Sequence, residues 1–113
     1  MEIYNASGHS INQEGITIVG ECAVPNADLA NPASMRGLAE KIAVEASLFV
    51  LRGFPVALPG MTTLSAMVIS MIQGITGYLP QIAWAARVDG VFVWSEEQVA
   101  DLHELRNRYR EKR

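Results

Sequence analysis

The chain has 113 residues, of which 50% are hydrophobic and 19% are charged, and its formal net charge is −3. This length suits one domain, the hydrophobic content is too high for a disordered chain, and the mild acidity argues against a dedicated DNA or RNA duplex binder. No Asp, Glu, Lys or Arg occurs between Arg52 and Arg87. A membrane span needs roughly 20 continuous apolar residues. Because polar residues, glycines and prolines interrupt this uncharged stretch, it predicts a protein core instead.

The first residues and the cysteine content indicate a location. Residues 1–5 have neither a basic start nor an apolar segment of signal-peptide length. Cys22 is the only cysteine, so it cannot form an internal disulfide. We therefore expect a cytoplasmic protein in which Cys22 is a small buried side chain.

The first third of the chain predicts two strands. Residues 2–5 form the first, and β-branched residues predict the second at 16–24. Between them, Ser10 and Gln13 have the spacing of a capping box for one short helical turn. The Pro, Asn and Asp content of residues 25–32 predicts a loop.

A helix is then expected to begin between Asn31 and Ser34, because Pro32 suits a first helical position. Apolar residues follow on one helical face, at Leu38, Ile42, Ala46 and Phe49. Gly53 is a plausible left-handed cap after the last turn. A strand at residues 48–51 remains the alternative, because short apolar runs are ambiguous.

The uncharged stretch predicts a strand and a helix. Residues 54–58 are continuously apolar, as in a strand buried on both faces. Residues 64–72 are apolar nearly all round and predict a largely buried helix. Thr62 or Thr63 caps its start, and Gly74 and Gly77 end it.

The last third predicts a hairpin and a helix. Residues 81–88 and 91–94 flank Asp89-Gly90, which favours a two-residue type I′ turn. Ser95 and Gln98 form a capping box that predicts the start of the last helix. Its packing stripe is Val99, Leu102, Leu105 and Tyr109, and its basic end predicts a solvated face on which Glu104 can pair with Arg108.

These elements predict an α/β fold over residues 1–113, with a mainly parallel sheet flanked by helices and a C-terminal hairpin. In such sheets ligands bind beyond the carboxyl ends of the strands. Two loops are candidates there, Asn5-Ala6-Ser7-Gly8-His9 and Pro59-Gly60-Met61-Thr62-Thr63. A glycine lets the backbone approach a ligand, and a helix N-terminus with hydroxyls at Thr62, Thr63 and Ser65 can bind phosphate without Lys or Arg. An ordinary strand-to-helix turn with a cap is the alternative.

Other chemistry has little support. No His, Cys or carboxylate cluster has metal-ligand spacing, so we expect no metal and no cofactor. No lysine follows Gly60 as a P-loop requires, and no G-x-G-x-x-G motif occurs. No Ser, His and Asp set can be assembled. The residues favour binding of a phosphate-bearing ligand over acid–base catalysis.

Four segments carry a family resemblance. They are residues 5–9, residues 58–66, the Gln73-Gly74-Ile75-Thr76-Gly77-Tyr78-Leu79-Pro80 segment, and residues 101–110. Together they resemble small accessory proteins of type III CRISPR systems, which are Rossmann-like (CARF-like) and linked to cyclic oligoadenylate signalling. Relatives favour His where this chain has Gln73, which weakens any catalytic role at that position.

The resemblance implies a homodimer, with larger oligomers left open, whose strand-end loops together hold cyclic tetra-adenylate and no DNA. It adds Gly74, Gly77 and Tyr78 to the ligand-binding residues, with Met61, Tyr78 and His9 packing on adenines and Ser7 contacting phosphate. Sequestration is favoured over slow cleavage, in which Ser7 or His9 would assist. The alternatives are a metal-independent ring nuclease proper, an unrelated nucleotide- or sugar-phosphate-processing enzyme of similar fold, and a purely structural interaction subunit.

Overall fold

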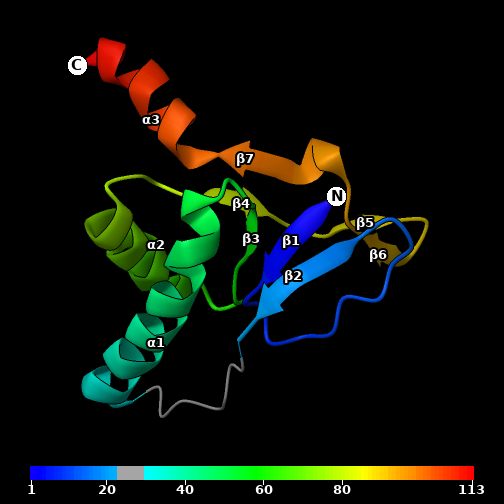
Figure 1. Cartoon of the computed structure of the whole chain (residues 1–113), viewed down its shortest axis with the longest axis horizontal. Coiled ribbons are helices and arrows are strands. Elements are labelled where there is room, and N and C mark those ends of the chain that lie inside the picture. The colour runs from blue at the N-terminus through cyan, green and yellow to red at the C-terminus, as the bar shows by residue number, and fades with distance from the viewer. Residues whose placement is uncertain (23–29) are drawn as a thin grey trace.

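The structure is a computed structural model that describes residues 1–22 and 30–113. Its centre is a five-stranded sheet in the order β2-β1-β3-β4-β7, with β7 antiparallel to β4 and the other neighbours parallel (Figure 1). The strands are β1 (Glu2–Asn5), β2 (Thr17–Glu21), β3 (Val56–Ala57), β4 (Gln81–Ala83) and β7 (Val99–Asp101). This confirms the α/β class and the mainly parallel sheet. The predicted end of the second strand and residues 25–29 of the predicted loop lie outside the described residues.

The strand order contains a switch point between β1 and β3. After β1 the chain moves outward to β2, whereas after β3 it moves the other way to β4. Loops that leave neighbouring strands in opposite directions leave a crevice between them at the carboxyl ends. The structure therefore has the feature that favours ligand binding in open α/β sheets.

The helix α1 (Pro32–Leu51) follows its predicted signals. The Asn31 side chain accepts hydrogen bonds from the backbone N–H groups of Ala33 and Ser34, so it caps the start. Gly53, with φ of 86°, follows the last turn. The helix continues through Leu51, so the alternative strand at residues 48–51 is wrong.

The helix α2 (Thr62–Thr76) is longer than predicted at both ends. Its N-cap is Met61, and no side chain caps it, so the expected caps at Thr62 and Thr63 are wrong. Gly77, with φ of 80°, ends the helix as predicted, whereas Gly74 lies inside it. One face of α2 is buried, through Leu64, Val68 and Ile72. The expectation of a largely buried helix was therefore too broad, because Ile75 and its neighbours face solvent.

Both helices cover one face of the sheet (Figure 1). Ile42 of α1 and Val68 of α2 belong to one buried cluster with Tyr4 and Val56 of the sheet. Successive residues of a strand point to opposite faces, so Ile3 and Ala57 face the other side, where they form a smaller cluster with Ala83. No described helix is long and apolar enough to cross a membrane.

Among the residues that the structure describes, loops and not a helix cover the second face. Ile11, Ile16 and Trp94 pack against the Ile3 cluster there. Ser10 and Gln13 do not cap a helical turn, because residues 10–13 are not helical. Gln13 bonds instead to the main chain of Trp94. This bond ties the crossover between β1 and β2 to a segment 81 residues further along the chain.

The predicted strand at 81–88 is divided. β4 ends at Ala83, and after Trp84 and Ala85 the chain leaves the main sheet to form a separate two-stranded sheet of β5 (Ala86–Val88) and β6 (Val91–Val93). Positive φ values of 51° at Asp89 and 79° at Gly90 fit the predicted type I′ turn. Residues 86–93 therefore form an antiparallel hairpin around the predicted turn, whereas residues 81–83, predicted as part of the same strand, belong to the main sheet.

The last helix starts later than predicted. The Ser95 hydroxyl donates to the Gln98 side chain, and residues 96–98 form only a short 3₁₀ turn, η1 (Glu96–Gln98). Val99 then belongs to β7, and α3 (Leu102–Tyr109) is capped by the Asp101 carboxylate, which accepts from the Glu104 N–H. A final 3₁₀ turn, η2 (Arg110–Lys112), follows. Glu104 pairs with Arg108 as expected.

The packing stripe expected on the last helix is largely unpacked. Leu105 and Tyr109 are exposed, and α3 projects away from the sheet (Figure 1). The first turn of α3 contacts the rest of the chain through His103. Its Nδ1 accepts from the Leu79 N–H, and its ring packs on Tyr78.

Buried Tyr4 and Cys22 predict a loss of stability in alkali. Burial raises the pKa of the Cys22 thiol above 9.0 and that of the Tyr4 phenol well above 10.0. Both groups are protonated in folded and unfolded chains below these values, but above them the unfolded chain releases the protons first. The free energy of unfolding should therefore fall as the pH rises above about 9. Urea unfolding from pH 7 to 11 measures this fall. A Cys22→Ala variant should have a shallower slope between pH 9 and 10, and an unchanged slope would contradict the assignment.

Candidate functional site

A cavity of about 400 Å³ lies at the carboxyl ends of β1, β3 and β4. It brings together the two loops that the sequence singled out, since Ser7 follows β1 and Gly60 follows β3. The start of α2 and the chain after β4 complete it. Its lining residues are Ser7, Leu58, Pro59, Gly60, Thr62, Ser65, Ile82, Ala83, Trp84, Ala85 and Trp94. We call this cavity the switch-point pocket.

The first loop is shaped by one buried side chain. Asn5 is 3% exposed, and its Oδ1 accepts from the Ser7 N–H at 3.0 Å and from the Ser7 hydroxyl at 2.6 Å. Its Nδ2 donates to the His9 carbonyl at 2.7 Å. Gly8, with φ of 81°, supplies the left-handed residue that lets the loop turn back. Asn5 therefore fixes the loop at the wall of the pocket.

The second loop leads directly into α2. The Ser65 hydroxyl donates to the Pro59 carbonyl at 2.6 Å, and the Ser65 N–H donates to the Met61 carbonyl at 3.0 Å. Because the first intrahelical bond is made by Ser65 and no side chain caps the helix, the N–H groups of Thr62 and Thr63 have no helical acceptor. The positive end of the helix dipole lies at the same place. This arrangement suits an anion.

The predicted ligand-binding residues divide into three groups. Ser7, Pro59, Gly60, Thr62 and Ser65 line the switch-point pocket. Asn5, Gly8, His9 and Thr63 lie in the same loops without lining it, and Met61 packs against the core under α1 and α2. Gly74, Gly77 and Tyr78 lie at the opposite end of α2, where the ring of Tyr78 meets that of His103 at 5.0 Å. The structure therefore does not bring this last group to the pocket.

Trp84 and Trp94 line the pocket but were not predicted to do so. The sequence places both in strands of a hairpin, and their pattern there does not distinguish them from core residues. In the structure Trp84 follows β4 and Trp94 follows β6, so the chain returns to the pocket after the excursion of the hairpin. Trp84 is 44% exposed. The sequence signal that could have indicated their proximity was their position on either side of the Asp89-Gly90 turn.

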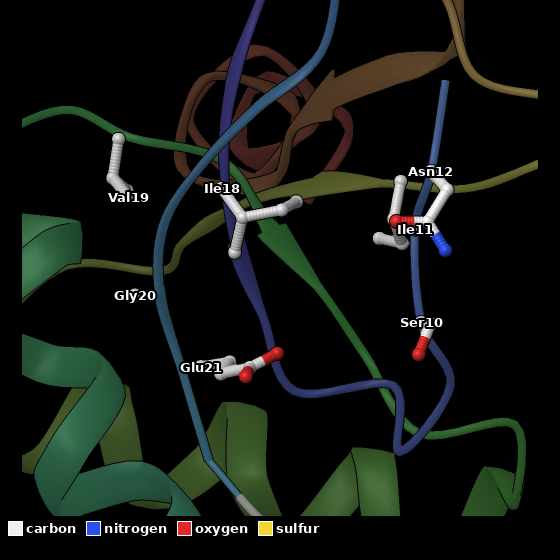
Figure 2. Close-up of a pocket in the computed structure, with 7 residues that line it drawn as sticks. All are labelled: Ser10, Ile11, Asn12, Ile18, Val19, Gly20 and Glu21. Atoms are coloured by element: carbon white, nitrogen blue, oxygen red, sulfur yellow. The ribbon is translucent and has the colours of Figure 1, made fainter.

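The switch-point pocket carries no titratable side chain in its lining. Two other cavities differ in this respect. The pocket of about 420 Å³ in Figure 2 lies between Ser10–Asn12 and β2 and includes the carboxylate of Glu21. A third, at the amino ends of the strands, includes Glu2 and Glu96. Because like charges repel, an anionic ligand is better accommodated by the switch-point pocket than by either of these.

Metal binding finds no support in the described part of the chain. No group of three or more His, Cys, Asp or Glu side chains there could hold an ion. The chemistry available at the switch-point pocket consists of hydroxyls, backbone N–H groups, a helix N-terminus and two indole rings. Such groups bind and orient a ligand but do not transfer protons at neutral pH.

Comparisons with protein-family models, with curated proteins and with solved structures find no match to this chain.

Proposed function

We propose that the chain is a cytoplasmic protein that binds a cyclic oligoadenylate, cyclic tetra-adenylate, across a homodimer and lowers its free concentration by sequestration. The fold would then be a CARF-like variant of the Rossmann-like architecture, and the role that of a small accessory protein of a type III CRISPR system. The observation that carries the proposal is the meeting of the Ser7 and Gly60 loops at the β1/β3 switch point, at the N-terminus of α2.

Electrostatics supports a phosphodiester ligand at this pocket. The N–H groups at the start of α2 and the hydroxyls of Ser7 and Thr62 offer donors to phosphate oxygens. No lining residue carries a carboxylate that would repel them. The absence of Lys and Arg from the lining is then no obstacle, since helix N-termini bind phosphate without them.

Sequestration is favoured over cleavage because the lining holds no acid or base. His9 is exposed and lies outside the lining, and its backbone N–H and C=O are engaged by Ser7 and Asn5. Ring cleavage by a ligand 2′-hydroxyl would have to rely on positioning alone. The geometry therefore supports a binder whose hydrolysis, where it occurs, is slow.

The size of the pocket supports a dimer. Its volume of about 400 Å³ lies near the lower end of the range for small-ligand sites, about 300–1,000 Å³, and is too small for a ring of four nucleotides. A two-fold symmetric ring can be shared between two identical pockets related by a two-fold axis. Each copy would then hold half of the ligand.

Isothermal titration calorimetry with cyclic tetra-adenylate tests the proposal, and the absence of binding at micromolar protein would refute it. A Gly60→Val variant should weaken binding at least tenfold, because Gly60 lines the pocket and the added side chain would take up space that the ligand needs. An added side chain there meets no protein atom within 4 Å, so the fold should be kept. Gly37→Ala is the matched control, because a side chain on this exposed face of α1 also meets nothing. Its affinity should be unchanged.

Chromatography of labelled ligand after incubation separates sequestration from cleavage. Recovery of intact ring from the complex is the expected result. Linear products that disappear with a Ser7→Ala or His9→Ala variant would show that the protein is a metal-independent ring nuclease instead.

A further inference from the structure

Each tryptophan of the switch-point pocket has both of its main-chain polar groups held by one glutamine. Oε1 of Gln13 accepts from the Trp94 N–H at 2.8 Å, and Nε2 of Gln13 donates to the Trp94 carbonyl at 2.8 Å. The carbonyl of Gln98 accepts from the Trp84 N–H at 3.2 Å, and Nε2 of Gln98 donates to the Trp84 carbonyl at 3.0 Å. These bonds join segments that are distant in sequence.

Gln98 also links the two tryptophan segments to each other. Its Nε2 donates to the carbonyl of Val93, the residue before Trp94, at 2.9 Å, and its Oε1 accepts from the Ser95 hydroxyl at 2.8 Å. Both amide hydrogens and the amide oxygen of Gln98 thus fix the chain on both sides of the hairpin. A backbone fixed in this way helps to preorganise the binding surface that its side chains form.

The side chain of Trp84 lies open to solvent at the edge of the pocket, where a ligand can contact it. Trp94 packs against the Ile3 cluster, whereas Trp84 is 44% exposed although its backbone is fixed. A large, partly exposed aromatic ring on a fixed stretch of backbone at the edge of a cavity is available for stacking. The opposite side of the pocket offers the hydroxyls and the helix N-terminus, so a ligand that combines an aromatic ring with a phosphate fits both sides.

We propose that Trp84 and Trp94 form an aromatic wall that takes a nucleobase of the ligand, and that Gln13 and Gln98 are the positioning residues of this wall. The inference deepens the proposed function and rests on it for the identity of the ligand. Base stacking on an aromatic side chain is sequence-tolerant and sizeable, about 1–3 kcal/mol per base, which corresponds to a change in affinity from about fivefold to more than a hundredfold.

Intrinsic fluorescence reports on this wall directly. The protein contains two tryptophans, Trp84 and Trp94, and both line the pocket, so no other indole contributes background. Three probes are titrated: cyclic tetra-adenylate, AMP and ribose 5-phosphate. The two adenine-bearing probes should quench the emission and protect it from acrylamide, and ribose 5-phosphate should not. Trp84→Phe and Trp94→Phe assign the quenching to each ring.

The affinity of Trp84→Ala is the second measurement. Because Trp84 is partly exposed, its removal should leave the fold intact and weaken binding of cyclic tetra-adenylate about tenfold or more, while Trp84→Phe should lose less. Tight binding of cyclic tetra-adenylate, without quenching of the tryptophan emission and without loss of affinity in Trp84→Ala, would refute the aromatic wall. The proposed function would then still stand. Quenching by AMP without binding of cyclic tetra-adenylate would support the wall and refute the function. The absence of both would refute both.

The role of the glutamines is tested in folded protein at low temperature. Gln98→Ala and Gln13→Ala should each raise the rotational mobility of the tryptophans, seen as lower fluorescence anisotropy, and weaken binding several-fold. Gln13→Glu keeps the acceptor for the Trp94 N–H and should recover part of the affinity. Gln73→Ala, on the exposed surface of α2, is the matched control. Reduced stability with unchanged anisotropy and affinity would show that the glutamines are structural only.

Discussion

Replacement of Asn5 by alanine is expected to lower the free energy of unfolding by about 2–3 kcal/mol. Asn5 is 3% exposed, and its amide makes hydrogen bonds to the Ser7 N–H, the Ser7 hydroxyl and the His9 carbonyl. Each such bond contributes about 0.5–1.5 kcal/mol net. Ser7 is half-buried and His9 is exposed, which limits the penalty for leaving their polar groups unpaired. Urea unfolding monitored by circular dichroism measures the loss.

Two further variants serve as controls for the stability loss expected of Asn5→Ala. Asn12→Ala removes an exposed asparagine from the same crossover and should cost under about 0.5 kcal/mol. Asn5→Asp keeps the acceptor of the Ser7 N–H but loses the donor to the His9 carbonyl, and it introduces a charge in a buried position, so it should be no more stable than Asn5→Ala. An Asn5→Ala protein of wild-type stability would show that the loop is held by other contacts.

The same substitution should also weaken ligand binding. Ser7 lines the switch-point pocket, and its position depends on the bonds from Asn5. A loop that moves freely has to be ordered on binding, and this cost appears as lost affinity. Under the proposed function, cyclic tetra-adenylate should bind about tenfold more weakly to folded Asn5→Ala than to the wild type, as measured by calorimetry.

Local signals predicted the start of α1 and the ends of α1 and α2 correctly, but not the starts of α2 and α3. The Asn31 cap, Gly53 and Gly77 each act through neighbouring backbone, so the sequence within a few residues determines them. The Asp89-Gly90 turn is equally local. The parallel sheet followed from the alternation of strands and helices, although β3 is shorter than its apolar run and β4 is cut short where Trp84 turns toward Gln98.

Both predicted capping boxes failed for one physical reason. Gln13 and Gln98 were expected to cap a turn three residues away, at Ser10 and Ser95. In the structure the amide of Gln13 bonds to the main chain of Trp94, 81 residues away, and not to Ser10. The amide of Gln98 bonds to the main chain of Trp84, 14 residues away, and keeps a bond to the Ser95 hydroxyl. A glutamine has the same capping pattern whichever partner it takes. Tertiary contacts therefore replaced the local one at Gln13 and were added to it at Gln98.

The candidate site was predictable in part for a related reason. The loops after β1 and β3 follow neighbouring parallel strands, so the carboxyl ends of those strands bring them together whatever the rest of the chain does. The tryptophans reach the pocket only because the chain returns after the hairpin and is fastened by the two glutamines. No local sequence pattern indicates that the chain returns to the pocket or that the two glutamines bond to it there.

Truncation of a fully buried core side chain, Ile42→Ala, is expected to lower the free energy of unfolding by about 3 kcal/mol. Ile42 is fully buried in the cluster between α1, α2 and the sheet. Removal of the methyl and methylene groups loses their transfer free energy and leaves a cavity, because the neighbours in α2 and β3 are held by their own packing. Chemical denaturation of the variant and the wild type measures the difference.

Leu48→Ala is the matched control on the same helix. Leu48 is 63% exposed, and Leu and Ala have similar helix propensities, so a loss of under about 0.5 kcal/mol is expected for the isolated chain. A loss equal to that of Ile42→Ala would contradict this burial pattern. A loss for Leu48→Ala that grows with protein concentration would instead show that the outer face of α1 is covered in a self-associated form, because association stabilises the folded state by mass action. Measurement of both variants over a hundredfold range of concentration therefore tests the core and the oligomeric state together.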